Sequence, residues 1–97
     1  MKKTNKLTKK YLILKKFQTI PGVGKSIAND LYLLGFRSIN DIKNKDPEKL
    51  YEKYCRLAGT KIDKCLLYVF RCAVYYTSKK FHDPKLLLWW NWKNKKN

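Results

Sequence analysis

The sequence has 97 residues, of which 44% are hydrophobic and 14% aromatic, so it can bury the core of one small domain. Its 23 Lys and Arg residues outnumber its 7 Asp and Glu residues, and the net charge of +16 favours acidic partners such as nucleic acid. No apolar run has the length of a membrane span or a signal-peptide core, which predicts a cytoplasmic protein with no membrane partner.

The positive charge is concentrated at the two ends of the chain. Residues 1–16 carry seven Lys and no acid, and residues 93–97 carry three more Lys. We therefore divide the chain into a Lys-rich N-terminal segment (1–16) that runs into the first helix, a single helical domain (17–93) and a basic tail (94–97). A Lys-rich genome would produce a similar excess, so charge alone does not identify a binding function.

Helical periodicity begins near the N-terminus. Apolar residues at helical spacing, from Leu7 to Phe17, predict a first helix over roughly residues 8–18. The Pro-Gly-Val-Gly sequence at residues 21–24 cannot continue that helix, because Pro lacks an N–H donor and Gly favours turns. A second helix is predicted from Lys25, with Gly35 as its C-terminal stop.

Further helices are predicted from their start signals, in which a side-chain oxygen caps the first turn. The capping residues are Ser38, Asp46, Asp63 and Asp83. The helix after Asp63, roughly residues 64–79, is apolar around most of its circumference and should form the centre of the core. No segment shows a strand pattern, so the predicted fold class is all-α, a compact bundle of about five to six helices.

The turn at residues 21–24 and the sequences that flank it resemble a helix-hairpin-helix motif. In such a motif the unpaired N–H groups of the second helix and the positive end of its dipole form a site for a phosphate oxygen. Val23 should point into the core. The predicted DNA phosphate-binding residues are Pro21, Gly22, Val23, Gly24, Lys25 and Ser26. Auxiliary basic contacts are predicted at Lys15, Lys16 and Arg37.

A site of this kind contacts phosphate and not base edges, so binding should be independent of sequence and sensitive to salt. The chain lacks a second Gly-apolar-Gly turn, and a single hairpin should bind weakly unless the basic tails, a dimer or a partner contribute. Two other interpretations stay open: a tight helical corner with no ligand, and a contact surface for protein.

Sequence motifs beyond the hairpin appear in the order found in a small bacterial family. They include Ile20-Pro21-Gly22-Val23-Gly24, Asp46-Pro47-Glu48-Lys49-Leu50-Tyr51 and Trp89-Trp90-Asn91-Trp92-Lys93. Over roughly residues 17–93 the chain resembles proteins labelled "pathogenicity locus" or helix-hairpin-helix domain-containing protein, some of them labelled mitomycin resistance proteins. The resemblance implies the fold and a link to DNA but no molecular activity.

Catalysis and metal binding are not expected. DNA glycosylases with this motif use a Lys nucleophile where this chain has Ser26, and Asn44 stands where their Asp partner is expected. Cys55, Cys65, Cys72 and His82 lack the close Cys-x-x-Cys spacing of zinc sites, so we expect reduced thiols in the core, no metal and no cofactor.

Three interpretations of the Trp cluster at residues 89–92 stay open: packing as a lid on the long helix, a base-stacking or partner surface that includes Trp90 and Trp92, and membrane anchoring. The predicted function is a non-catalytic, largely sequence-independent DNA-binding accessory protein that prefers duplex and serves repair or recombination, with a protein of those processes as a further partner. The alternative is a protein-interaction module that docks onto a nucleic-acid enzyme.

Overall fold

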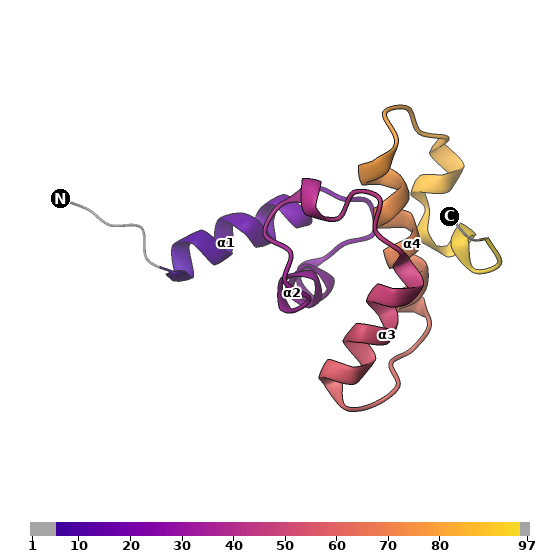
Figure 1. Ribbon diagram of the computed structural model, residues 1–97. Coiled ribbons are helices and arrows are strands. Elements are labelled where there is room, and N and C mark those ends of the chain that lie inside the picture. Colours follow the sequence, from indigo (N-terminus) through magenta and orange to yellow (C-terminus); the bar gives the residue numbers. More distant parts are fainter. Residues whose placement is uncertain (1–5, 96–97) are drawn as a thin grey trace.

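The computed structural model describes residues 6–95, with side chains from Thr8 onward. This range forms four α-helices, three short 3-10 helices and no strand (Figure 1). They are α1 (Lys6–Phe17), α2 (Lys25–Leu33), η1 (Ile39–Asp41), α3 (Pro47–Ala58), α4 (Cys65–Ser78), η2 (Pro84–Leu87) and η3 (Trp89–Trp92). The all-α class is confirmed. The count of five to six helices is not, because the two predicted helical segments after Ser38 and Asp83 form only short 3-10 turns. The start of the Lys-rich segment and the end of the basic tail lie outside the described residues.

Local hydrogen bonds place the helix starts where the capping residues predict them. Each predicted cap accepts a backbone N–H two or three residues later: Ser38 from Asp41, Asp46 from Glu48, Asp63 from Cys65 and Asp83 from Lys85. At η1 the Asp41 carboxylate also accepts the Ser38 N–H at 3.2 Å, which completes a capping box.

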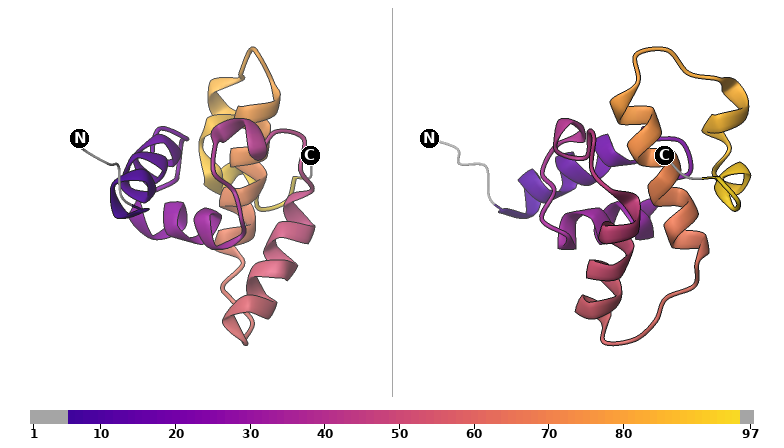
Figure 2. Two further views of the ribbon diagram at one scale, coloured as in Figure 1. Left: turned by 60° about the vertical axis from the view of Figure 1, so that its left-hand side comes forward. Right: turned by 45° about the vertical axis from the view of Figure 1, so that its right-hand side comes forward.

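Two pairs of helices make up the body of the molecule. In the views of Figures 1 and 2, α1 lies against α2, α3 lies beside α4, and the C-terminal turns η2 and η3 cover another side of α4. The N-terminal part of α1 projects away from this body. Buried residues from all four α-helices form the core, and the largest that are fully buried are Phe17, Ile20, Leu31, Ile42, Phe70 and Cys72.

The central helix is α4, as its apolar sequence predicts. Eight of its residues are buried, and it packs against both α3 and η3. No helix in the described part of the chain is long and apolar enough to cross a membrane.

One charged side chain is buried within this apolar helix. Arg71 of α4 is 6% exposed, and its guanidinium forms an ion pair with Glu48 in the first turn of α3. It also donates to the Trp92 carbonyl oxygen at 2.8 Å and to the Lys93 carbonyl oxygen at 3.3 Å. A buried cation is tolerated only when paired and hydrogen-bonded, so these contacts join the start of α3 and the C-terminal segment to α4.

Replacing Glu48 by Gln should therefore destabilise the fold, because the buried guanidinium loses its counter-charge. We expect the free energy of unfolding to fall by about 2 kcal/mol, measured by urea denaturation. Glu52→Gln is the matched control on the exposed side of α3 and should change stability by less than about 0.5 kcal/mol. Equal losses in the two variants would refute this role of the ion pair.

Candidate nucleic-acid interface

The hairpin turn (residues 18–24) connects α1 to α2 through short-range hydrogen bonds. The Ile20 N–H donates to the Phe17 carbonyl oxygen and the Val23 N–H to the Ile20 carbonyl oxygen, both at 3.0 Å. Ile20 and Val23 are buried, so the prediction that Val23 points into the core is confirmed. Pro21 is half-buried between them, and both glycines of the turn are exposed.

The second helix begins at this turn without a side-chain cap. Gly24 takes the N-cap position in extended backbone geometry, and its carbonyl oxygen accepts the Ala28 N–H at 2.9 Å. Within the described residues, the N–H groups of Lys25, Ser26 and Ile27 have no acceptor. A Cβ placed at Gly24 would meet nothing within 4 Å, and Lys25 and Ser26 are exposed, so the positive end of the α2 dipole lies at the surface.

A basic groove of about 320 Å³ lies on one side of the hairpin turn. It is lined by Tyr11, Leu14, Lys15, Gln18 and Lys25. Tyr11, Leu14 and Lys15 share one face of α1, and Gln18, the first residue of the turn, follows at the same helical spacing. The structure thus brings two predicted basic residues, Lys15 and Lys25, to one groove. Gln18 was not among the predicted site residues, although its spacing of four residues from Leu14 places it on the same helical face.

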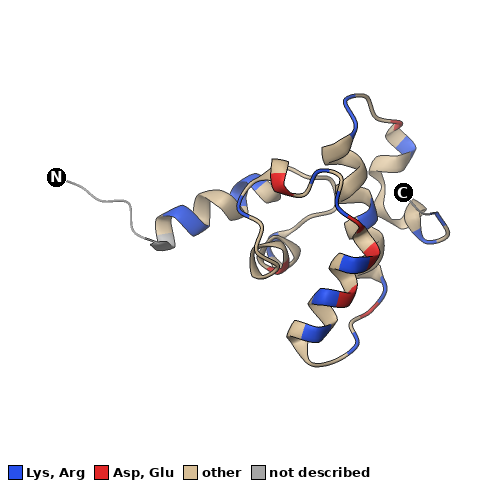
Figure 3. Cartoon of the chain, viewed as in Figure 1, with Lys and Arg blue, Asp and Glu red and all other residues tan. Residues whose placement is uncertain are grey.

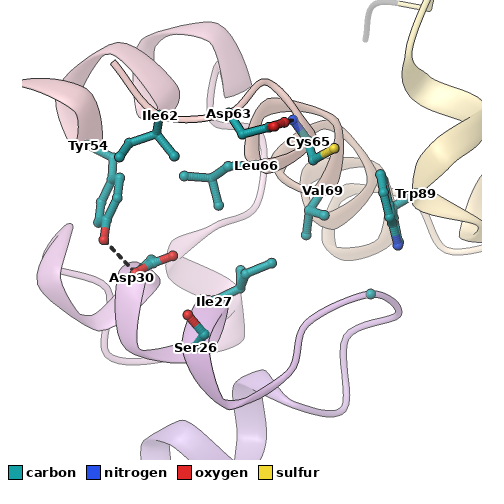
Figure 4. Close-up of a pocket in the computed structure, with 11 residues that line it drawn as sticks. Ser26, Ile27, Asp30, Tyr54, Ile62, Asp63, Cys65, Leu66, Val69 and Trp89 are labelled. Carbon is teal, nitrogen blue, oxygen red and sulfur yellow. Dashed lines mark hydrogen bonds between the residues drawn. The ribbon is translucent and has the colours of Figure 1, made fainter. Parts of the chain in front are cut away.

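The opposite side of the turn faces a groove of different chemistry, about 390 Å³ in volume (Figure 4). Apolar side chains line most of it, together with the two carboxylates of Asp30 and Asp63. Asp30 accepts a hydrogen bond of 2.7 Å from the Tyr54 hydroxyl, and the N–H of Cys65 lowers the pKa of Asp63. Both carboxylates disfavour a phosphate here, so an anion should approach the hairpin from the Lys15 side.

Ser26 lines this mostly apolar groove with its two carboxylates, while Lys25 lines the basic groove. The two residues were predicted to act together on one phosphate. The two residues line different grooves, and Ser26 shares the open end of the helix with Lys25 only through its backbone N–H group.

The other auxiliary residues also lie apart from Lys25. Lys16 and Arg37 line a separate groove of about 330 Å³ with Leu12, Ile13, Ser38 and Ile39. The Arg37 guanidinium is held in place: it donates to the Tyr32 carbonyl oxygen at 2.8 Å and lies 3.6 Å from the centre of the Tyr32 ring. Lys16 and Arg37 therefore extend the basic surface around α1 and do not join the groove of Lys15 and Lys25.

The Trp cluster is divided between core and surface. Trp92 is 2% exposed, and its indole N–H donates to the Leu86 carbonyl oxygen at 2.8 Å. The prediction of Trp92 as partner surface is therefore wrong, because η3 turns this ring onto α4. Trp90 is 55% exposed and remains a candidate contact. Trp89 covers one side of the hairpin turn at Gly22, a contact that the sequence did not reveal.

The cysteines do not form a ligand cluster. Within residues 6–95, no three His, Cys, Asp or Glu side chains lie close enough to hold a metal ion. Cys72 is buried, and this burial raises the pKa of its thiol to about 11. Cys65 is exposed and Cys55 half-buried, so the prediction of core thiols is correct for Cys72 and wrong for Cys65, which lies in the first turn of α4.

Fold and surface together define a small, basic, all-helical protein with an uncapped helix N-terminus beside two lysines. The chain belongs to the pathogenicity locus (Cdd1) family, whose model matches residues 10–97. Over 56 residues it is 34% identical to the mitomycin resistance protein McrB of Streptomyces lavendulae. That match covers 58% of this chain and 53% of the relative, so it spans about half of the relative's length. No solved structure matches the chain.

Replacing Gly22 by Ala tests how the hairpin turn meets the C-terminal segment. Gly22 has φ +84°, and an added Cβ would lie 3.0 Å from Cδ1 of Trp89. We expect the variant to lose about 1–2 kcal/mol of stability and to change its tryptophan fluorescence, because Trp89 must move. In the control Gly35→Ala, φ is +102° but no atom lies within 4 Å of the Cβ, so stability should fall without a fluorescence change. Identical spectra in the two variants would contradict the Trp89 contact.

Proposed function

We propose that this protein is a non-catalytic DNA-binding accessory protein whose hairpin turn acts as a helix-hairpin-helix and holds one backbone phosphate. The observation that carries the proposal is the uncapped start of α2, which opens beside Lys25 and Lys15. A phosphate oxygen would accept the free N–H groups of the first turn, the helix dipole would favour its charge, and the two ammonium groups would surround it.

The expected binding mode follows from these donors. Backbone N–H groups and lysines contact phosphate and not base edges, so the protein should bind DNA with little sequence preference. A B-form duplex presents its phosphates at regular spacing to an exposed helix end, and duplex is the form we propose for this contact. One phosphate site is weak, and the net charge of +16 would supply additional long-range attraction.

We further propose that the protein acts in the cytoplasm, in DNA repair or recombination. Its three free cysteines support a reducing compartment. The mitomycin resistance named for the Streptomyces relative would fit a protein that acts on DNA.

A second candidate function is a protein-interaction module that docks onto a nucleic-acid enzyme. The exposed Trp90 ring supports it, because large aromatic side chains are enriched where proteins bind one another. The two functions differ in the role of the hairpin. Phosphate binding requires the positive charge of Lys25, whereas a protein-docking module does not.

Titration of labelled duplex DNA with wild type and Lys25→Glu tests the proposed phosphate contact. We expect affinity to fall by roughly tenfold in the variant, and the slope of log affinity against log salt to decrease by about 0.9. Lys49→Glu on the exposed surface of α3 makes the same charge change away from the hairpin, and its effect should be smaller. Absence of duplex binding by the wild type at about 50 mM salt would rule out the proposal. Equal losses of affinity in Lys25→Glu and Lys49→Glu would show that the hairpin does not bind the phosphate.

A carboxylate placed at the N-cap should compete with phosphate for the same donors. Gly24 has the extended geometry of an N-cap and open space around it, so Gly24→Asp should cap α2 with its own side chain. We expect thermal stability to be unchanged or higher by about 1 kcal/mol, while duplex affinity falls by roughly tenfold or more. Gly24→Ala, which adds a methyl group and no acceptor, should lose much less affinity. Full duplex binding by Gly24→Asp would show that phosphate does not occupy this helix end.

A further inference from the structure

A second basic cleft lies at the C-terminal end of α4, formed by other residues than the hairpin. Its volume is about 430 Å³. Its apolar wall is formed by Val74, Tyr75, Leu86 and Trp92, and three lysines line it: Lys45, Lys79 and Lys95. Asn44 and Ser78 complete the lining.

The three lysines come from distant parts of the sequence, and the fold holds these parts together. Lys45 is positioned by its neighbour Asn44, whose N–H donates to the Ser78 hydroxyl oxygen at 2.8 Å. Lys95 follows the segment that Arg71 binds through the Trp92 and Lys93 carbonyl oxygens. The cleft is thus a product of tertiary structure and not of a local run of lysines.

No carboxylate balances these charges within the cleft, because its nine lining residues include neither Asp nor Glu. The acids near the cleft lie outside its lining: Asp46 accepts the Glu48 N–H and Asp83 the Lys85 N–H, both at 3.0 Å. The pKa of Asp41 is lowered by the Arg37 N–H and also by the charge of Lys45, so this carboxylate offsets part of the charge from outside. Three ammonium groups gathered at one cleft repel one another, and an anion with several oxygens would offset that repulsion.

An exposed aromatic ring lies in the loop that continues from Lys79 of the cleft. Phe81 is 84% exposed and follows Lys79 by two residues, in the loop between α4 and η2. This loop forms one end of the molecule, and it carries Lys80 in addition to Lys79, with the acid Asp83 at its end (Figures 1 and 3). Lys80 Nζ lies 5.9 Å from the centre of the Phe81 ring. A free aromatic face next to cations suits an unpaired base, which can stack on it, whereas duplex bases are already stacked on one another.

We propose that the cleft and Phe81 form a second nucleic-acid site, which takes an unpaired strand. Lys45, Lys79 and Lys95 bind its phosphates, and Phe81 stacks on a base next to them. This site lies outside the hairpin, and only its class of ligand rests on the proposed function.

Fluorescence anisotropy with a short labelled oligothymidylate tests this site in the full-length protein. Phe81→Ala should weaken binding roughly tenfold, the usual scale for one stacked base. Lys79→Glu should weaken it by a similar factor and reduce the salt slope by about 0.7, the value for one contact on single-stranded DNA. Both side chains are exposed, so the variants should keep the wild-type circular dichroism spectrum.

Matched controls separate this site from a general effect of charge or exposed apolar area. Lys49→Glu and Leu57→Ala change exposed residues of α3 and should leave oligothymidylate affinity nearly unchanged. Lys25→Glu should weaken duplex binding and spare the oligothymidylate. Single-strand binding that depends on Phe81 supports the cleft even if duplex binding fails. Unchanged oligothymidylate affinity in Phe81→Ala and Lys79→Glu would overturn the proposal. It would also be overturned if binding to anionic phosphatidylserine vesicles depended on Phe81 while binding to the oligothymidylate did not.

Discussion

The buried guanidinium of Arg71 connects three parts of the chain that pack together in the core. Its partners are Glu48 at the start of α3 and the carbonyl oxygens of Trp92, the last residue of η3, and Lys93, and all three are 21 to 23 residues away in sequence. Because the C-terminal segment consists only of short 3-10 turns, its own hydrogen bonds give it little stability. The Arg71 contacts fix it on α4. Trp89 then lies against Gly22 of the hairpin turn, and Lys95 lies at the cleft beyond α4.

The sequence predicts well those features that depend on neighbouring residues. A helix cap needs an acceptor and an N–H group two or three positions away, so Ser38, Asp46 and Asp63 mark helix starts without knowledge of the fold. The sharp turn before Lys25 follows in the same way from its Pro and Gly residues. The all-α class and the central position of α4 need only the periodicity of apolar residues.

Features that depend on tertiary neighbours could not be predicted. Trp90 and Trp92 are two residues apart and chemically identical, yet one is exposed and the other buried, because only Trp92 faces α4 and Leu86. Cys65 and Cys72 share one helix, but the first turn of α4 leaves Cys65 in solvent. The division of the basic residues among three grooves likewise depends on how α1, α2 and the C-terminal segment pack, which no local pattern encodes.

Two weak nucleic-acid sites on one folded domain would together bind a suitable DNA more tightly than either proposed site alone. The proposed hairpin contact suits a duplex phosphate, and the proposed cleft with Phe81 suits an unpaired base. When one site is occupied, the other meets its own part of the same DNA at a high effective concentration, so the two affinities reinforce each other if the geometry allows both contacts. A uniform duplex or a plain single strand offers only one of the two ligands. Selectivity for DNA with a duplex next to unpaired nucleotides would then arise without any base-specific contact, from the placement of two phosphate-binding surfaces on a common core.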